Sequence, residues 1–167
     1  MGSQSPTYKY KFGEAGACEL LVEGLATHMT VLKNARFGCL AVSVLASHVK
    51  NGQIFSKISN CCEVVVSVLK LHLSAPTVAE YGCCSIANLA NQEGNRTHMG
   101  KAGACELVIL AINTHLGVPA VVEQACWAIA NLTPNNGNNR VCLGREGACE
   151  AVVRVLLTHI GTSTVAE

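Results

Sequence analysis

The sequence predicts an all-α fold in which about four helical repeats of ~44 residues stack side by side as a solenoid. The main observation is a Cys-Glu dipeptide that recurs at intervals of 44, 43 and 44 residues. A histidine lies ten residues after each of these cysteines, and a second cysteine series has the same spacing. The three series are Cys18, Cys62, Cys105 and Cys149; His28, His72, His115 and His159; and Cys39, Cys83 and Cys126. This period is longer than the ~33–34 residues of the shorter helical repeats and fits the class with ~40–47 residues.

The composition agrees with closely packed helices. Hydrophobic residues make up 50% of the chain and aromatic residues only 4%, so the core must consist mainly of small aliphatic side chains and cysteine. The net charge of +1 argues against nucleic acid as a partner, because phosphate binding needs a concentrated basic surface. The longest apolar stretch, 107–122, is too short and too interrupted to span a membrane. No signal peptide and no Cys-x-x-Cys pair are evident, so we expect reduced thiols and a cytoplasmic or nuclear location.

The third repeat shows best how each unit divides into helices. Residues 94–101 form a short first helix, which ends near Gly103. Glycine accepts a left-handed backbone cheaply, so this position predicts a sharp turn between helices. The second helix covers 104–115, and Pro119 opens a third helix that continues to Leu132, since a proline at the first helical position loses no hydrogen bond. The equivalents of Gly103 are Gly16, Asn60 and Gly147.

The predicted unit boundaries follow from this alignment. The units are 8–50, 51–93, 94–137 and a partial fourth unit at 138–167, preceded by a tag or disordered lead at 1–7. The fourth unit stops just inside its third helix, so we expect the chain to be a segment of a larger protein. An uncovered apolar face is therefore expected on the second helix of this unit, at Ala151, Val152, Val155 and Leu156. Solenoid ends normally carry polar caps, and we expect self-association through the exposed ends.

Two segments of the third unit, 103–108 and 122–132, resemble the armadillo repeat family. The first has the Gly-Ala that opens the family's second helix, and the second has an Ala-x-Trp-Ala-x-x-Asn-Leu run typical of its third helix. The resemblance covers about residues 9–167. It implies a right-handed solenoid whose third helices line a concave groove that binds an extended peptide. The first unit departs from the pattern, with Leu40 and Val44 in place of the tryptophan and asparagine.

The resemblance also implies contact residues in the groove. Asn88 and Asn131 match the asparagine that hydrogen-bonds a bound peptide backbone, and Trp127 matches the tryptophan that packs against side-chain stems of the ligand. One turn earlier the same stripe carries carboxylates in three units, which favours a basic or amine-bearing partner. The residues of this stripe are Arg36, Glu80, Glu123 and Glu167. We therefore expect a non-catalytic protein-interaction scaffold that binds a protein or extended peptide through Glu80, Asn88, Glu123, Trp127 and Asn131.

Two other functions remain open. The chain could be a structural spacer arm of a multidomain protein, or a metal-binding module that uses its cysteines and histidines. A residue that occurs once per repeat forms a row, whereas zinc needs about four ligands at one point, so we expect no metal, no cofactor and no catalytic residue. We expect each histidine to cap carbonyl groups in the last turn of its helix and the repeated cysteines to fill the core. Cys61, Cys84 and Cys142 break the register and are predicted to be the exposed thiols.

Overall fold

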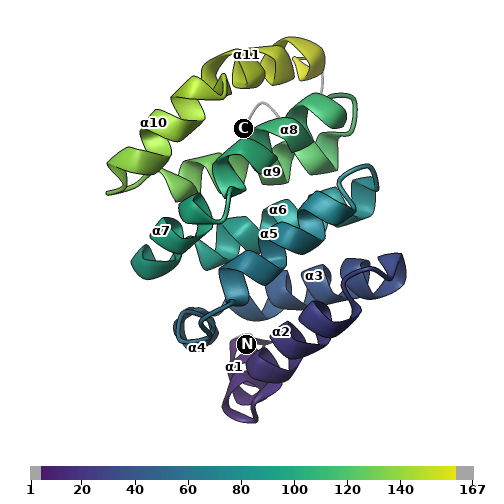
Figure 1. The fold of residues 1–167 in the computed structure, drawn as a ribbon, viewed down its shortest axis with the longest axis vertical. Helices are drawn as coiled ribbons and strands as arrows, with labels where there is room; N and C mark the ends of the chain where they lie inside the picture. Colours follow the sequence, from purple (N-terminus) through teal and green to yellow (C-terminus); the bar gives the residue numbers. More distant parts are fainter. Residues whose placement is uncertain (1–4, 161–167) are drawn as a thin grey trace.

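The computed structural model describes residues 5–160, and every regular element in that range is an α-helix (Figure 1). The predicted all-α class is therefore confirmed. The lead at 1–4, the end of the fourth unit and Glu167 lie outside the described residues. The helices are α1 (Ser5–Glu14), α2 (Ala17–His28), α3 (Leu32–Ala46), α4 (Val49–Phe55), α5 (Cys61–Leu71), α6 (Pro76–Leu89), α7 (Glu93–Lys101), α8 (Ala104–Thr114), α9 (Pro119–Leu132), α10 (Gly137–Arg145) and α11 (Ala148–His159).

The helices are arranged in rows. Helices α2, α5, α8 and α11 follow one another along the molecule, and α3, α6 and α9 form a second row behind them (Figure 1). The short helices α4, α7 and α10 lie along one side. Substantial contacts join only helices of the same triplet or of adjacent triplets, so the core runs along the molecule between the two rows. In the described residues no helix is long and apolar enough to cross a membrane.

The turn between the first and second helix of each triplet depends on a backbone conformation that favours glycine. Gly16, Gly103 and Gly147 have φ angles of 84°, 91° and 79°, in the left-handed region. The prediction was wrong at Asn60, which has φ −106°. The connection between α4 and α5 is longer than its counterparts, so it reverses direction without a left-handed residue.

Small residues let the two rows approach closely. A Cβ atom on Gly38 would collide with the side chain of Leu25, and a Cβ on Gly82 would press against Leu69 in the same way one repeat later. In the third repeat the equivalent residue is Ala125, which is fully buried. The low aromatic content thus corresponds to close packing of the helices against one another, as expected for small side chains.

The cysteine predictions are confirmed for most of the repeated positions and wrong at three others. The repeated cysteines that are buried are Cys18, Cys39, Cys62, Cys83 and Cys105. Cys126 is half-buried, and Cys149 is exposed because no described helix covers α11 on its outer side. Cys61, predicted to be exposed, is buried at the start of α5, and Cys84 and Cys142 are half-buried.

The predicted apolar face of α11 needs a similar correction. Ala151 and Val155 are buried, because α11 packs with them against α8 and α9. Leu156 is exposed, as expected. The other exposed apolar residues of this helix end are Val153, Leu157 and Ile160. The uncovered face is therefore rotated with respect to the predicted one.

Candidate functional site

The third-helix row, α3, α6 and α9, carries the residues that the sequence predicted to contact a partner. Arg36, Glu80 and Glu123 occupy equivalent positions on the three helices and influence one another electrostatically. Burial raises the pKa of the Glu80 carboxyl, the negative charge of Glu123 raises it further, and Arg36 opposes both effects. Within the described residues neither Glu80 nor Glu123 forms an ion pair. The two carboxylates therefore form a local site of unbalanced negative charge.

Trp127 lies one helical turn beyond Glu123 on α9, and Asn131 lies one turn further. Residues four apart share a helix face, so the three side chains form one stripe. Trp127 is 43% exposed, so much of its indole ring is accessible to a partner. This stripe places an aromatic surface directly beside a carboxylate on one side and an amide on the other.

The two asparagines have internal partners that the sequence did not reveal. Asn88 Nδ2 donates to the carbonyl oxygen of Ser43 at 3.0 Å, and Asn131 Nδ2 donates to that of Ala87 at 2.9 Å. Both bonds tie a third helix to the third helix of the preceding repeat. Asn88 is only 5% exposed and offers little surface to a partner. Asn131 is half-buried, and its Oδ1 accepts no hydrogen bond from the described residues.

Each described histidine after the first in the repeated series binds the preceding repeat. The Nε2 atoms of His72, His115 and His159 lie 2.7, 2.6 and 2.7 Å from the carbonyl oxygens of Met29, Leu73 and Leu116, respectively. A carbonyl can only accept, so each Nε2–H donates. The prediction that each histidine caps the last turn of its own helix is therefore wrong, because the carbonyl it binds belongs to the preceding repeat. Such a row holds units together and leaves the rings unavailable as a common metal site.

A further series of asparagines in the first helices was missed. Asn51, Asn95 and Asn139 are all buried, and their Nδ2 atoms donate to backbone carbonyls. Asn51 reaches Lys9 in the preceding triplet, and Asn139 reaches both Leu132 and Arg96. Their spacing of 44 residues was a visible signal in the sequence. They stabilise the stacking and are not exposed for binding.

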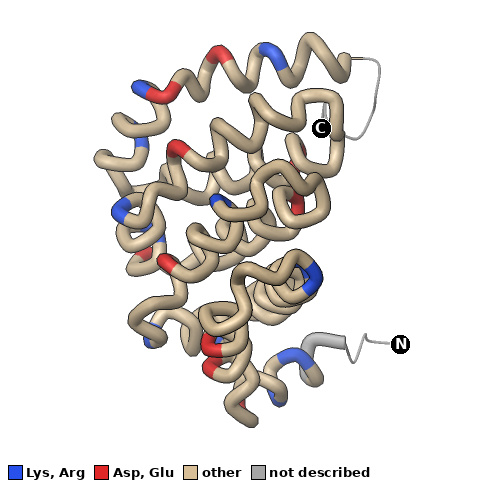
Figure 2. The backbone as a smooth tube through the Cα atoms, turned by 45° about the vertical axis from the view of Figure 1, so that its right-hand side comes forward, with Lys and Arg blue, Asp and Glu red and all other residues tan. Residues whose placement is uncertain are grey.

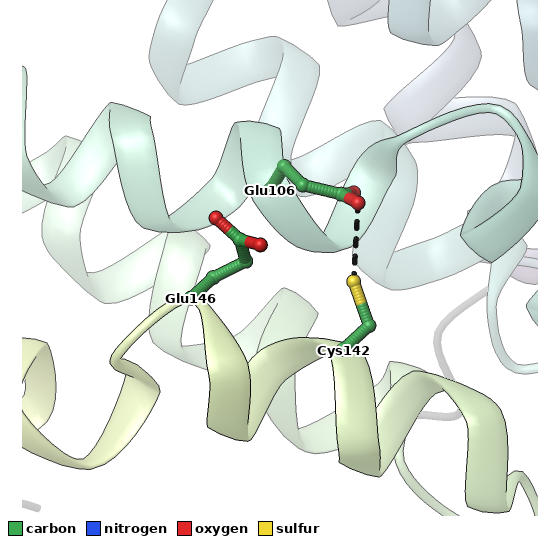
Figure 3. A group of neighbouring side chains, drawn as sticks. All are labelled: Glu106, Cys142 and Glu146. Atoms are coloured by element: carbon green, nitrogen blue, oxygen red, sulfur yellow. Dashed lines mark hydrogen bonds between the residues drawn. The ribbon is translucent and has the colours of Figure 1, made fainter.

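One cluster outside the third-helix row brings together possible metal ligands. Oxygen and sulfur atoms of Glu106, Cys142 and Glu146 lie within 4.8 Å of one another (Figure 3). The Cys142 thiol donates to Glu106 Oε1 at 3.2 Å. Burial raises the pKa of this thiol, and the adjacent Glu106 raises it further. Arg145 lies 3.0 Å from Glu146 and 3.6 Å from Glu106, so its single positive charge already offsets part of the negative charge of the two carboxylates, and the thiol would have to lose its proton to bind a metal.

The buried cysteines are equally unsuited to nucleophilic chemistry. Burial raises the pKa of Cys18 to about 11 and those of Cys39, Cys62 and Cys105 to about 12, and it raises the pKa of Cys61 and Cys83 as well. The reactive form of cysteine is the thiolate, which these surroundings disfavour.

Comparison with models of known families, with curated proteins and with solved structures finds no match to this chain.

Proposed function

We propose that this chain is an armadillo-type solenoid and a non-catalytic protein-interaction scaffold, which binds an extended basic peptide along the row formed by α3, α6 and α9. The observation that carries the proposal is the stripe on α9, where exposed Trp127 lies between Glu123 and Asn131. Glu80 on the neighbouring helix adds a second carboxylate without an ion pair. The repeated spacing and the contacts between adjacent triplets support the solenoid architecture.

The side chains of the α9 stripe and of the neighbouring helix α6 each have a physical role in this binding mode. The carboxylates of Glu80 and Glu123 attract a lysine or arginine side chain of the peptide, while the indole of Trp127 packs against its aliphatic stem and its cation. Asn131 Oδ1 accepts a hydrogen bond from a peptide N–H, since its Nδ2 is already engaged with Ala87. Asn88 fixes α6 against α3 and so keeps the row in place.

The distribution of charge is compatible with a peptide rather than a nucleic acid. Figure 2 shows Lys and Arg spread over the length of the described chain and interspersed with Glu. Nucleic-acid binding needs basic side chains concentrated on one surface.

The test uses Trp127 as its own reporter, because it is the only tryptophan of the chain. Synthetic extended peptides rich in lysine or arginine are titrated while the tryptophan emission is recorded, with acidic peptides of the same length as controls. Basic peptides should shift the emission saturably and acidic ones should not. Glu123→Gln should weaken the binding by about threefold to tenfold, which corresponds to about 1 kcal/mol for one exposed charge pair.

The matched control is Glu63→Gln, which removes an exposed carboxylate from α5 in the other row. It should leave the affinity unchanged. Equal losses for Glu63→Gln and Glu123→Gln would assign the binding to overall charge and contradict the proposed surface. No emission change with any peptide would leave the spacer function as the better explanation.

A further inference from the structure

The two ends of the helix array expose surfaces whose equivalents are buried inside it. At the beginning, Leu20 on α2 is 69% exposed, whereas its counterpart one repeat later, Val64, is 6% exposed. At the end, Val153 on α11 is 53% exposed, whereas its counterpart Ile109 is 3% exposed. In the inner repeats these positions are covered by the neighbouring triplet. The ends therefore carry the two halves of the contact that joins successive repeats.

The first end also has an unfilled groove. Leu20, Gly24, His28 and Phe37 line an apolar cavity of about 370 Å³ between α2 and α3. Phe37 is exposed at its rim. In the next repeat, the residues equivalent to Leu20 and Gly24 are Val64 and Val68, both buried. A groove of this kind accepts apolar side chains of a preceding unit.

The second end presents apolar side chains of the matching kind. Ile160, 80% exposed, directly follows His159, just as Leu116, half-buried, follows His115. Leu156 is exposed, and its counterpart Ile112 is fully buried. The surface at this end is thus the same face that α8 uses to receive α11. It differs only in having no described helix upon it.

The repeated histidines form a hydrogen bond that fixes the register between one triplet and the next. His72, His115 and His159 each donate to the carbonyl of the residue that follows the preceding histidine. His28 occupies the same position in the row and is exposed, and its imidazole has no hydrogen-bond partner among residues 5–160. The carbonyl that would continue the series is that of Ile160, which follows the last histidine. One donor and one equivalent acceptor therefore lie at opposite ends of the described helix array.

We propose that two copies of this chain associate head to tail, with the α2–α3 end of one copy packed on the α11 end of the other. The contact repeats the one between consecutive triplets within the chain, with His28 Nε2 donating to the carbonyl of Ile160 of the second copy. A second copy is favoured over an unrelated partner because both the apolar positions and the histidine spacing match this chain's own repeat. Such an interface is heterologous and leaves one free end of each type, so association continues with concentration. It does not involve the third-helix stripe and is independent of the proposed peptide binding.

The experiment uses two variants of the full 167-residue chain, each with a substitution that blocks one of the two ends. Their mass is measured by sedimentation equilibrium and light scattering. The unaltered chain should show a mass that rises with concentration above the 17.5 kDa of one copy. Leu20→Asp should block one end and Val153→Asp the other, and each variant alone should stay at 17.5 kDa. Both positions are exposed, so the fold is retained, which far-ultraviolet circular dichroism verifies.

Mixing the two variants in equal amounts decides the geometry. The intact α11 end of Leu20→Asp and the intact α2–α3 end of Val153→Asp fit together, so the mixture should give a dimer and nothing larger. His28→Ala in the Val153→Asp partner should weaken this dimer about fivefold, the loss of one hydrogen bond. Leu110→Asp, at an exposed apolar residue in the middle of the second-helix row, is the matched control and should not change association.

Three results would overturn the proposal. A strictly monomeric unaltered chain at several hundred micromolar would exclude the interface. A dimer of either blocked variant alone would show a symmetric contact between like ends. A mixture that remains monomeric would show that the two ends do not fit each other.

Discussion

The row of histidines makes a quantitative prediction about how the repeats are held together. His115 is buried, and its Nε2 donates to the carbonyl of Leu73 at 2.6 Å, one repeat away. His115→Ala removes the donor and leaves that half-buried carbonyl without its partner. A lost hydrogen bond costs about 0.5–1.5 kcal/mol, and a buried group left unsatisfied costs about 1–3 kcal/mol, so the free energy of unfolding should fall by about 2–3 kcal/mol.

The matched control is His28→Ala, at the same position of the first repeat. The imidazole of His28 is exposed and has no hydrogen-bond partner in the described chain, so its loss should change the free energy of unfolding by no more than about 0.5 kcal/mol. His115→Gln retains an N–H donor and should recover part of the lost stability. Urea unfolding followed by far-ultraviolet circular dichroism, at a concentration where the protein is monomeric, measures all three variants. Equal effects of His115→Ala and His28→Ala would refute the reasoning, since burial and the contact between repeats would then be irrelevant.

Four other predictions follow from glycine and cysteine positions. A Cβ on Gly100 would collide with the side chain of Asn139 on α10, whereas a Cβ on Gly144 would face open space. Gly100→Ala should therefore destabilise the protein by about 1–3 kcal/mol and Gly144→Ala should not, which thermal unfolding of the two variants measures. Gly103→Ala should cost about 1–2 kcal/mol in the same assay, because φ is 91° there. Burial raises the pKa of Cys39 to about 12, so the unfolded chain loses this proton first. Stability should therefore decline as the pH rises above the ordinary cysteine pKa of about 8.5, which urea titrations at pH 7–10 would reveal, whereas an unchanged midpoint would contradict it. Brief alkylation followed by mass spectrometry should modify exposed Cys149 long before Cys39.

Much of the helix pattern could be read from the sequence because it depends on local signals. The recurrent cysteines and histidines gave the period, and Pro119 and Gly103 predicted where helices begin and turn. Glycine at a left-handed turn and proline at the first helical position act on their own backbone, so they need no knowledge of distant residues. Asn60 failed as a turn marker because the connection there is longer, which the identity of one residue does not encode.

The candidate stripe was predicted only in part. Trp127 and Glu123 lie together on one exposed face, as helical spacing indicates. The roles of Asn88 and Asn131 were not foreseen, because their donors reach carbonyls 45 and 44 residues earlier in the chain. Such bonds depend on how adjacent helices stack, and the sequence of one helix carries no direct record of that distance.

By itself the sequence determined the repeat, its period, the helix ends of the third unit and the absence of concentrated charge. Only the tertiary structure decided which residues at matching repeat positions also have the same surroundings. Cys105 is buried, whereas Cys149 is exposed. The His115 ring has a carbonyl partner, whereas the His28 ring has none in the described chain. The physical reason is that each repeat buries its surface against its neighbours, so an identical residue has a different environment at the end of the array than inside it.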